Sequence, residues 1–187
     1  MDGKKIGIIV AIGAVLVLIL GFIGGYNNLV NLETGVQEMS ANIDTQLQRR
    51  ADLIPNLVKT VKSYAEHETE VFDAVNEARE HLVNAQSMAE KSAANEEVSA
   101  ALSRLVAIAE NYPDLKSDKL YIDLMDELAG SENRISYARE EYNAAAARYN
   151  KAIRRFPGVI FANMFGFEKV EMFEAAEGSE KVPDVDL

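Results

Sequence analysis

Apolar residues recur every three or four positions through most of the chain after Tyr26, and this spacing predicts α-helices. Four series follow one another, over residues 29–47, 57–78, 98–109 and 120–153. The alternation of apolar and polar residues that is typical of strands does not occur outside short runs. The pattern therefore predicts an all-α fold, built as an antiparallel bundle of about four long helices.

The N-terminal segment has a different pattern, because residues 6–25 form a run of 20 residues without a charge. A helix of this length spans about 30 Å, the thickness of a bilayer's hydrocarbon core. A cleaved signal peptide is the alternative, but the run is longer than usual and no clear cleavage pattern follows it. We therefore expect an anchor over residues 1–25, the helical bundle over 26–168 and an acidic, loosely ordered tail over 169–187.

The charges around the apolar run predict the orientation of the anchor. Lys4 and Lys5 precede the run, whereas the first charged residue after it is Glu33 and the first basic one is Arg49. Basic residues favour the cytoplasmic side of a membrane. We therefore expect a single-pass protein of the cell membrane, with a cytoplasmic N-terminus and an extracytoplasmic bundle.

Proline, glycine and capping residues predict where the helices end. Pro55 indicates a corner or kink between the first two helices. Ser92–Asn95 is a weaker break, with Asn95 a candidate N-cap, although a continuous helix is the alternative. The stretch 111–119 reads as a loop with Ser117 as the next N-cap, and the last helix is expected to end near residues 156–158.

Composition narrows the classes of function. The formal net charge is −11, so nucleic acid phosphates would be repelled and we expect no nucleic-acid partner. The chain has no cysteine, which excludes disulfides, thiolate metal sites and thiol catalysis.

Candidate catalytic chemistry is sparse. His67 and His81 are fourteen residues apart, which is about 21 Å along one helix, so they cannot share a metal ion. Neither histidine belongs to a metal-binding pair of the HExxH or ExxH kind, and no glycine-rich phosphate loop is present. We therefore predict no catalytic residue, no metal site and no cofactor.

Two adjacent arginines, Arg49 and Arg50, stand before Pro55. Arg50 lies seven residues from Ile43 and seven from Leu57, so an uninterrupted helix would place it on their apolar face. A buried guanidinium needs polar partners, and we expect Arg50 to fix the register of the bundle through a contact between helices. In the alternative, both arginines face water at the corner. The candidate partners are the Ala51 carbonyl that Pro55 leaves free, Asp44, Asp52, Glu110 and Glu132.

Two further groups are candidates for structural or binding roles. Tyr142–Asn143 and Tyr149–Asn150 lie two helical turns apart on one face, where they are expected to pack against other helices or to form a stripe that recognises a partner. The segment 156–167 is apolar, and antiparallel helices would return it to the membrane. It is expected to pack on its own bundle, enter the bilayer interface or contact another subunit. Its phenylalanines are Phe156, Phe161, Phe165 and Phe167.

The sequence resembles the LemA family over nearly its whole length. The matching pieces are YNNLVNL after the anchor, IDTQLQRRADLIPNLVKTVKSYAEHE, ENYPDLKS, ENRISYAREEYNAAAARYN and FPGVIF…FGF. The resemblance implies a membrane-anchored protein whose cytosolic or external domain is an antiparallel helical bundle. It implies no settled biochemical activity.

These observations favour a non-enzymatic membrane scaffold or adaptor that associates with copies of itself. A sensor or signalling ectodomain that acts through a membrane-protein partner is one alternative. A bundle that binds a small ligand or a metal ion is the other.

Overall fold

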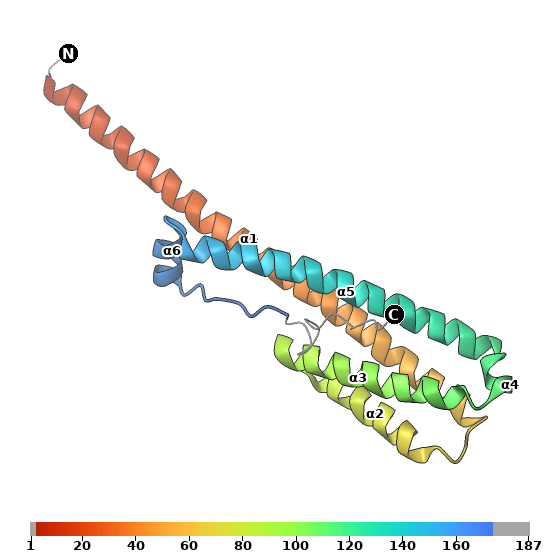
Figure 1. Cartoon of the computed structure of the whole chain (residues 1–187). Helices are drawn as coiled ribbons and strands as arrows, with labels where there is room; N and C mark the ends of the chain where they lie inside the picture. The colour runs from red at the N-terminus through yellow and green to blue at the C-terminus, as the bar shows by residue number, and fades with distance from the viewer. Residues whose placement is uncertain (1–2, 174–187) are drawn as a thin grey trace, which may run out of the picture. The chain divides into compact units, whose positions relative to one another are not determined.

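A computed structural model describes residues 3–173 and shows helices without a strand over that range (Figure 1). The helices are α1 (Gly3–Lys62), α2 (Thr69–Asn84), α3 (Met88–Ala109), α4 (Pro113–Lys116), α5 (Lys119–Arg154) and α6 (Gly158–Phe165). The all-α prediction is therefore confirmed. The chain divides into two compact units, one comprising residues 1–38 and 144–170 and the other residues 39–143 and 171–187.

The unit of residues 39–143 is built from four long helical segments, which are the C-terminal part of α1, α2, α3 and the N-terminal part of α5. Short connections at 63–68 and 85–87 reverse the chain, as in an antiparallel bundle. Each segment turns an apolar stripe inward, as its spacing predicts. The buried side chains include Ile43, Leu47, Ile54, Leu57, Phe72, Val75, Val98, Leu105, Leu128 and Ile135.

The predicted corner at Pro55 is wrong, because α1 continues through this proline to Lys62. Ile54 and Leu57 on either side of it are fully buried, so the apolar face continues across the proline. Proline removes the hydrogen bond that the Ala51 carbonyl would accept within the helix. The Nε of Arg79, on α2, donates to this carbonyl at 2.8 Å and replaces the missing bond.

Two helix starts also differ from the predictions. The break lies at 85–87 instead of Ser92–Asn95, and Ser87 caps α3 in a capping box with Glu90. Ser92 and Asn95 are buried inside α3. At the start of α5 the side chain of Asp118, not that of Ser117, accepts a bond from the N–H of Tyr121. The expected loop over residues 111–119 is wrong in part, because Pro113–Lys116 form the short helix α4 with the proline in its first turn. The end of the last long helix agrees with the pattern, because α5 ends at Arg154.

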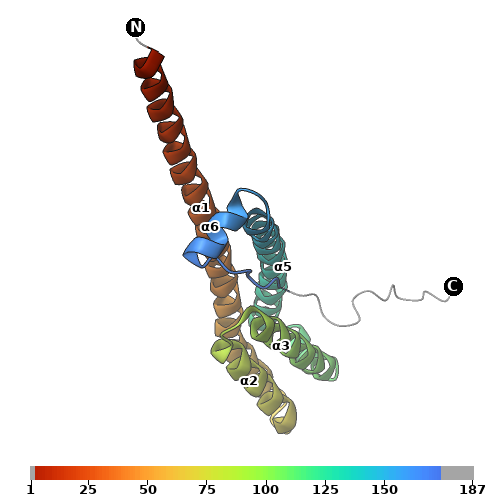
Figure 2. The same cartoon turned by 90° about the vertical axis from the view of Figure 1, so that its left-hand side faces the viewer.

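The unit of residues 1–38 and 144–170 contains the start of α1, the end of α5 and α6. Figure 2 shows α6 lying beside α1, and the rings of Phe22 and Phe161 pack edge to face with their centroids 5.0 Å apart. Leu29, Val36, Tyr149 and Ile153 form the buried contacts of α1 and α5 in this unit. The return of the chain to the apolar end of α1, expected from helix alternation, is present.

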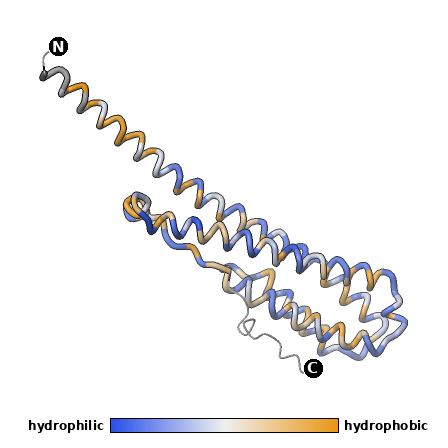
Figure 3. Tube along the Cα trace, turned by 45° about the horizontal axis from the view of Figure 1, so that its top comes forward, coloured by the Kyte–Doolittle hydropathy of each residue, from blue (hydrophilic) through white to orange (hydrophobic). Residues whose placement is uncertain are grey.

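The first part of α1 is apolar, as the hydropathy colours show (Figure 3), and its side chains are exposed. Val17 and Leu18 are 70% and 72% exposed. In the described part of the chain, α1 is the one helix long and apolar enough to cross a membrane.

The beginning of the expected loose tail is held in place. Residues 169–173 are extended, and Val170 and Phe173 each form hydrogen bonds with an asparagine of α5. The rest of the expected tail, residues 174–187, lies outside the described residues.

Candidate functional site

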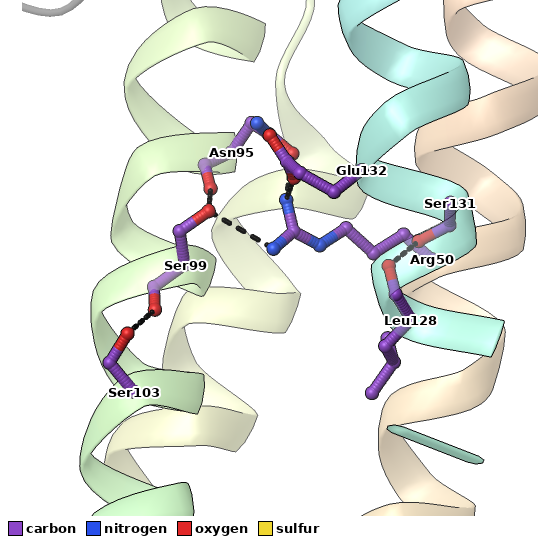
Figure 4. A network of polar contacts seen from close by, with 7 residues as sticks. All are labelled: Arg50, Asn95, Ser99, Ser103, Leu128, Ser131 and Glu132. Carbon is purple, nitrogen blue, oxygen red and sulfur yellow. Dashed lines mark hydrogen bonds and ion pairs between the residues drawn. The ribbon is translucent and has the colours of Figure 1, made fainter. Parts of the chain in front are cut away.

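The most extensive buried polar group of the residue 39–143 unit is centred on Arg50 (Figure 4). Its Nη1 donates to Oδ1 of Asn95 at 2.6 Å and to the carboxylate of Glu132. Its Nη2 donates to the hydroxyl of Ser99 at 3.0 Å. Arg50 therefore connects α1 to α3 and α5, and the contact between helices predicted for it is present.

The local sequence explains how these partners reach Arg50. Asn95 and Ser99 are four residues apart on α3, so they lie on one face of that helix, and Ser99 also donates to the Asn95 carbonyl. Glu132 reaches inward from α5 and remains 43% exposed, whereas the Arg50 side chain is 5% exposed. The ion pair therefore lies at the edge of the core.

Burial lowers the pKa of the Arg50 guanidinium, and the negative charge of Glu132 opposes this shift. A guanidinium is too strong a base to lose its proton in a folded protein, so Arg50 stays charged at neutral pH. A permanent buried charge requires its partners in every folded molecule. The Arg50 group, which consists of Arg50, Asn95, Ser99 and Glu132, is therefore suited to fix helix register. Both Nη atoms of the guanidinium have partners within the group, whereas its buried Nε has none.

The other carboxylates considered as partners of Arg50 form contacts with other residues. Asp44 forms an ion pair with Lys91 at 2.5 Å, and Asp52 accepts a hydrogen bond from Gln48. Glu110 pairs with Lys116 at 2.5 Å. Among the carboxylates considered, the structure therefore selects Glu132.

Arg49 differs from Arg50 although it is the next residue. It pairs with Glu127 at 2.9 Å, and both side chains are about half exposed. This pair lowers the pKa of Glu127, mainly through the hydrogen bond from Arg49. An exposed pair of this kind contributes little to stability.

The tyrosine and asparagine pairs of α5 contact the chain's own C-terminal segment. In one unit Asn143 exchanges two hydrogen bonds of 2.8 Å with the backbone of Phe173, and the Tyr142 hydroxyl donates to the Glu171 carbonyl. In the other, Asn150 forms the same pair of bonds with Val170, at 2.9 and 3.0 Å. The asparagines therefore hold extended backbone, a role that the expectation of bridges between helices did not include.

Tyr149 and Tyr142 are buried, as their helical spacing predicts. Burial raises the pKa of the Tyr149 phenol, and the nearby negative charge of Glu33 adds to the shift. Burial likewise raises the pKa of Tyr142. Neither phenol is therefore activated as a base, and the structural role of both tyrosines is the simpler interpretation.

The phenylalanines of residues 156–167 divide between buried and exposed positions. Phe161 is 5% exposed, whereas Phe156 is 82% exposed. Phe165 and Phe167 face Tyr26, with ring centroids 4.8 and 5.9 Å from its own. Of the three expected placements, packing on the chain's own helices accounts for one face of α6 only.

The described residues bring no metal-binding set together, since no three His, Asp or Glu side chains are grouped as ligands. His81 instead pairs with Glu97 at 2.8 Å. This hydrogen bond, followed by the negative charge of Glu97, raises the pKa of His81.

Sequence reasoning did not find Asn95, Ser99 or Arg79 as partners of α1. A buried polar residue in a helix produces no signal beyond a gap in the apolar stripe. Ser87 and Glu90, in contrast, carry the S-x-x-E capping signature, which was available in the sequence and marks the start of α3.

Comparison with known proteins identifies the family. The model of the LemA family matches residues 39–187, which is most of the chain. The chain belongs to the LemA family. The match includes the Arg50 group and the asparagines of α5.

Three named relatives of this LemA family member are between 26% and 32% identical to it over the aligned residues. The magnetosome protein MamQ of Magnetospirillum gryphiswaldense is 32% identical, over 79% of this chain and 64% of its own length. The magnetosome protein MamQ 2 of Paramagnetospirillum magneticum is 28% identical, over 89% of this chain and 71% of its own. Protein LemA of Metamycoplasma hominis is 26% identical, over 83% and 72%. The chain thus spans less than two thirds of the first relative's length.

Proposed function

We propose that this LemA family member is a non-enzymatic, single-pass membrane scaffold that presents its helical bundle outside the cytoplasm and associates with copies of itself. The observation that carries the proposal is the exposed apolar part of α1. Side chains such as Val17, Leu18 and Leu20 are between 68% and 72% exposed. Apolar surface of this extent needs a covering, and a bilayer matches its length.

The continuity of α1 favours an anchor over a cleaved signal peptide. The helix runs without a break from Gly3 to Lys62. Phe22, near the end of the apolar run, packs against Phe161 and Phe165. Cleavage after the apolar run would remove this ring from its contacts with α6.

The chemistry of the bundle supports a scaffold more than a catalyst. The charged and amide groups around Arg50 are engaged with one another, and a carboxylate already neutralises the guanidinium. Catalysis requires a nucleophile, base or Lewis acid directed at a space that a substrate can enter. The contacts of Arg50 instead join helices, and those of Asn143 and Asn150 hold backbone.

Cysteine labelling tests the orientation, because the natural chain has no cysteine. Asp2→Cys and Glu140→Cys are made separately in the full chain, and intact cells are treated with a maleimide that cannot cross membranes. The proposal predicts labelling at position 140 and none at position 2 until the cells are permeabilised. The reverse pattern would refute the extracytoplasmic bundle, and labelling of both positions in intact cells would refute the span.

Self-association is tested on the detergent-extracted full chain by native mass spectrometry. The proposal predicts an oligomer that cross-linking in intact membranes also recovers. A strict monomer in both experiments would reject the scaffold, and a stoichiometric second protein would favour the signalling alternative. A bound metal ion or small molecule in the same spectra would favour the ligand-binding alternative.

A further inference from the structure

We infer that α6 is an interfacial helix, whose outer side lies in the bilayer surface while neighbouring basic residues contact lipid phosphates. The outer side consists of Ile160, Met164 and Phe165. Together with Phe156, which is exposed just before the helix, these residues form what we call the interfacial patch. The basic group consists of Lys151, Arg154 and Arg155. The inference rests on the proposed membrane span by α1 and assigns a lipid-binding surface to the same end of the molecule.

The contacts of α6 determine its level along α1. Phe161 and Phe165 pack on Phe22, with ring centroids 5.0 and 6.0 Å away. Phe22 lies three residues before the end of the uncharged run at residue 25, which is about 4.5 Å of helix. Phe165 also contacts Tyr26, directly after the run, where a tyrosine suits the boundary between lipid and water. The helix α6 therefore lies where the hydrocarbon core would end.

The two sides of α6 differ in burial, although neither carries a charge. Phe161 and Ala162 are buried against the chain. On the interfacial patch Phe156 is 82%, Met164 60%, Phe165 47% and Ile160 46% exposed. Residues 156–167 contain no charged residue. An exposed apolar helix without a charge that is held beside a transmembrane segment is suited to lie in the interface.

The charge of the chain changes sign at this end. Residues 144–170 contain five basic residues and one acidic residue, a balance of +4, whereas residues 39–143 contain 11 basic and 20 acidic residues, a balance of −9. Lys151, Arg154 and Arg155 are exposed and line one shallow recess. Within the described residues none of the three forms an ion pair. Exposed basic residues beside a bilayer attract anionic lipid head groups.

A bilayer fits this surface better than a second copy of the chain. The interfacial patch adjoins the exposed apolar part of α1, because the Phe165 ring contacts the Phe22 ring. In a symmetric dimer within one membrane the same surface meets itself. The basic group of each copy would then lie near that of the other, and like charges would repel.

Depth-dependent fluorescence quenching tests the inference on the full chain. Met164→Cys is labelled with an environment-sensitive dye and reconstituted in vesicles of phosphatidylcholine and phosphatidylglycerol. Spin-labelled lipids carry the quencher either near the head group or deep in the acyl chain. Leu18→Cys serves as the control for the membrane span, and Ala144→Cys, exposed on α5, as the control for water.

The expected result is stronger quenching of the Met164 dye by the shallow quencher than by the deep one, with the reverse at position 18 and no quenching at 144. A Met164 dye in water, with position 18 still quenched, would overturn the interfacial helix and leave the anchor intact. Unquenched dyes at both positions would refute the anchor and the inference with it. A Met164 dye shielded without quenching, and cross-linked to a second copy, would show that another subunit covers the patch.

The basic group is tested in the same vesicles. In the variant Lys151→Gln/Arg154→Gln/Arg155→Gln we expect phosphatidylglycerol to lose its enhancing effect on Met164 quenching. The control Lys59→Gln/Lys62→Gln/Lys119→Gln removes three charges from exposed positions of the bundle and should keep the enhancement. Equal behaviour of the two variants would overturn the role of the basic group. High salt should act on the natural chain as the first variant does, because it shortens the Debye length to about 3 Å at 1 M.

Discussion

Replacement of Arg50 by alanine is expected to destabilise the bundle far more than the same replacement of Arg49. Arg50→Ala leaves the Oδ1 of Asn95 without its donor, in a residue that is 2% exposed. An unsatisfied buried polar group costs about 1–3 kcal/mol. The lost methylene groups of the buried stem contribute about 0.8 kcal/mol each.

The carboxylate of Glu132 limits the loss. It is 43% exposed, so it regains hydration when Arg50 is removed and does not remain as a fully buried charge. Removal of one partner from a fully buried ion pair costs about 3–5 kcal/mol. We place the loss of stability in Arg50→Ala at the lower end of this range, at about 3 kcal/mol. For a chain of 187 residues this corresponds to a decrease in Tm of about 6–12 °C.

The assay is urea and thermal unfolding of the full chain in detergent, followed by far-UV circular dichroism. Arg49→Ala is the matched control, because its pair with Glu127 is exposed and contributes little to stability. Arg50→Lys retains the charge without the planar fork that serves both Asn95 and Ser99, so it should fall between the two alanine variants. Equal free energies of unfolding for Arg50→Ala and Arg49→Ala would refute the reasoning.

Three further predictions follow from individual contacts. A Cβ on Gly25 would overlap the Phe161 ring, whereas one on Gly24 would meet nothing within 4 Å. Gly25→Ala should therefore make the α6 segment more sensitive to proteolysis than Gly24→Ala does. Equal rates of digestion in the two variants would contradict this packing. The Glu97 hydrogen bond raises the pKa of His81 above the ordinary histidine value of about 6.5. Their pairing therefore stabilises the fold fully below that value, and the effect is lost as pH rises through the raised pKa. NMR titration should show a lower His81 pKa in Glu97→Gln, and an unchanged pKa would reject the pairing. Asn150→Ala removes both hydrogen bonds to the segment after α6 and should speed proteolysis there, without a change in helix content.

The all-α class and the apolar faces of the long helices were predictable from the sequence, because burial imposes a period of 3.6 residues on any amphipathic helix. The place of Arg50 was predictable for the same reason, since seven residues are about two turns. The corner at Pro55 was not, because proline removes one hydrogen bond and tertiary contacts decide whether another donor replaces it. Arg79 is 28 residues further along the chain, and no local pattern relates it to Ala51.

The asparagines of α5 show a second limit. Their spacing of seven residues predicted a common face, but an amide side chain bonds equally well to another helix, a partner or extended backbone. Only the path of the chain after α6 decides among these, and residues 169–173 lack the periodicity from which a path could be read.

The arginine of the Arg50 group and the arginines at the end of α5 lie in opposite environments. Arg50 is buried, and its charge is neutralised by Glu132. Asn95 also accepts a hydrogen bond from it, so the interactions of Arg50 stabilise the fold. Arg154 and Arg155 are exposed and form no ion pair with the described residues. A chain of net charge −11 offers many carboxylates with which an exposed arginine can pair. Because Arg154 and Arg155 form no such pair within the described residues and lie beside the uncharged helix α6, a binding surface is favoured there. The distribution of arginines therefore directs the search for function away from the conspicuous Arg49–Arg50 pair and toward α6.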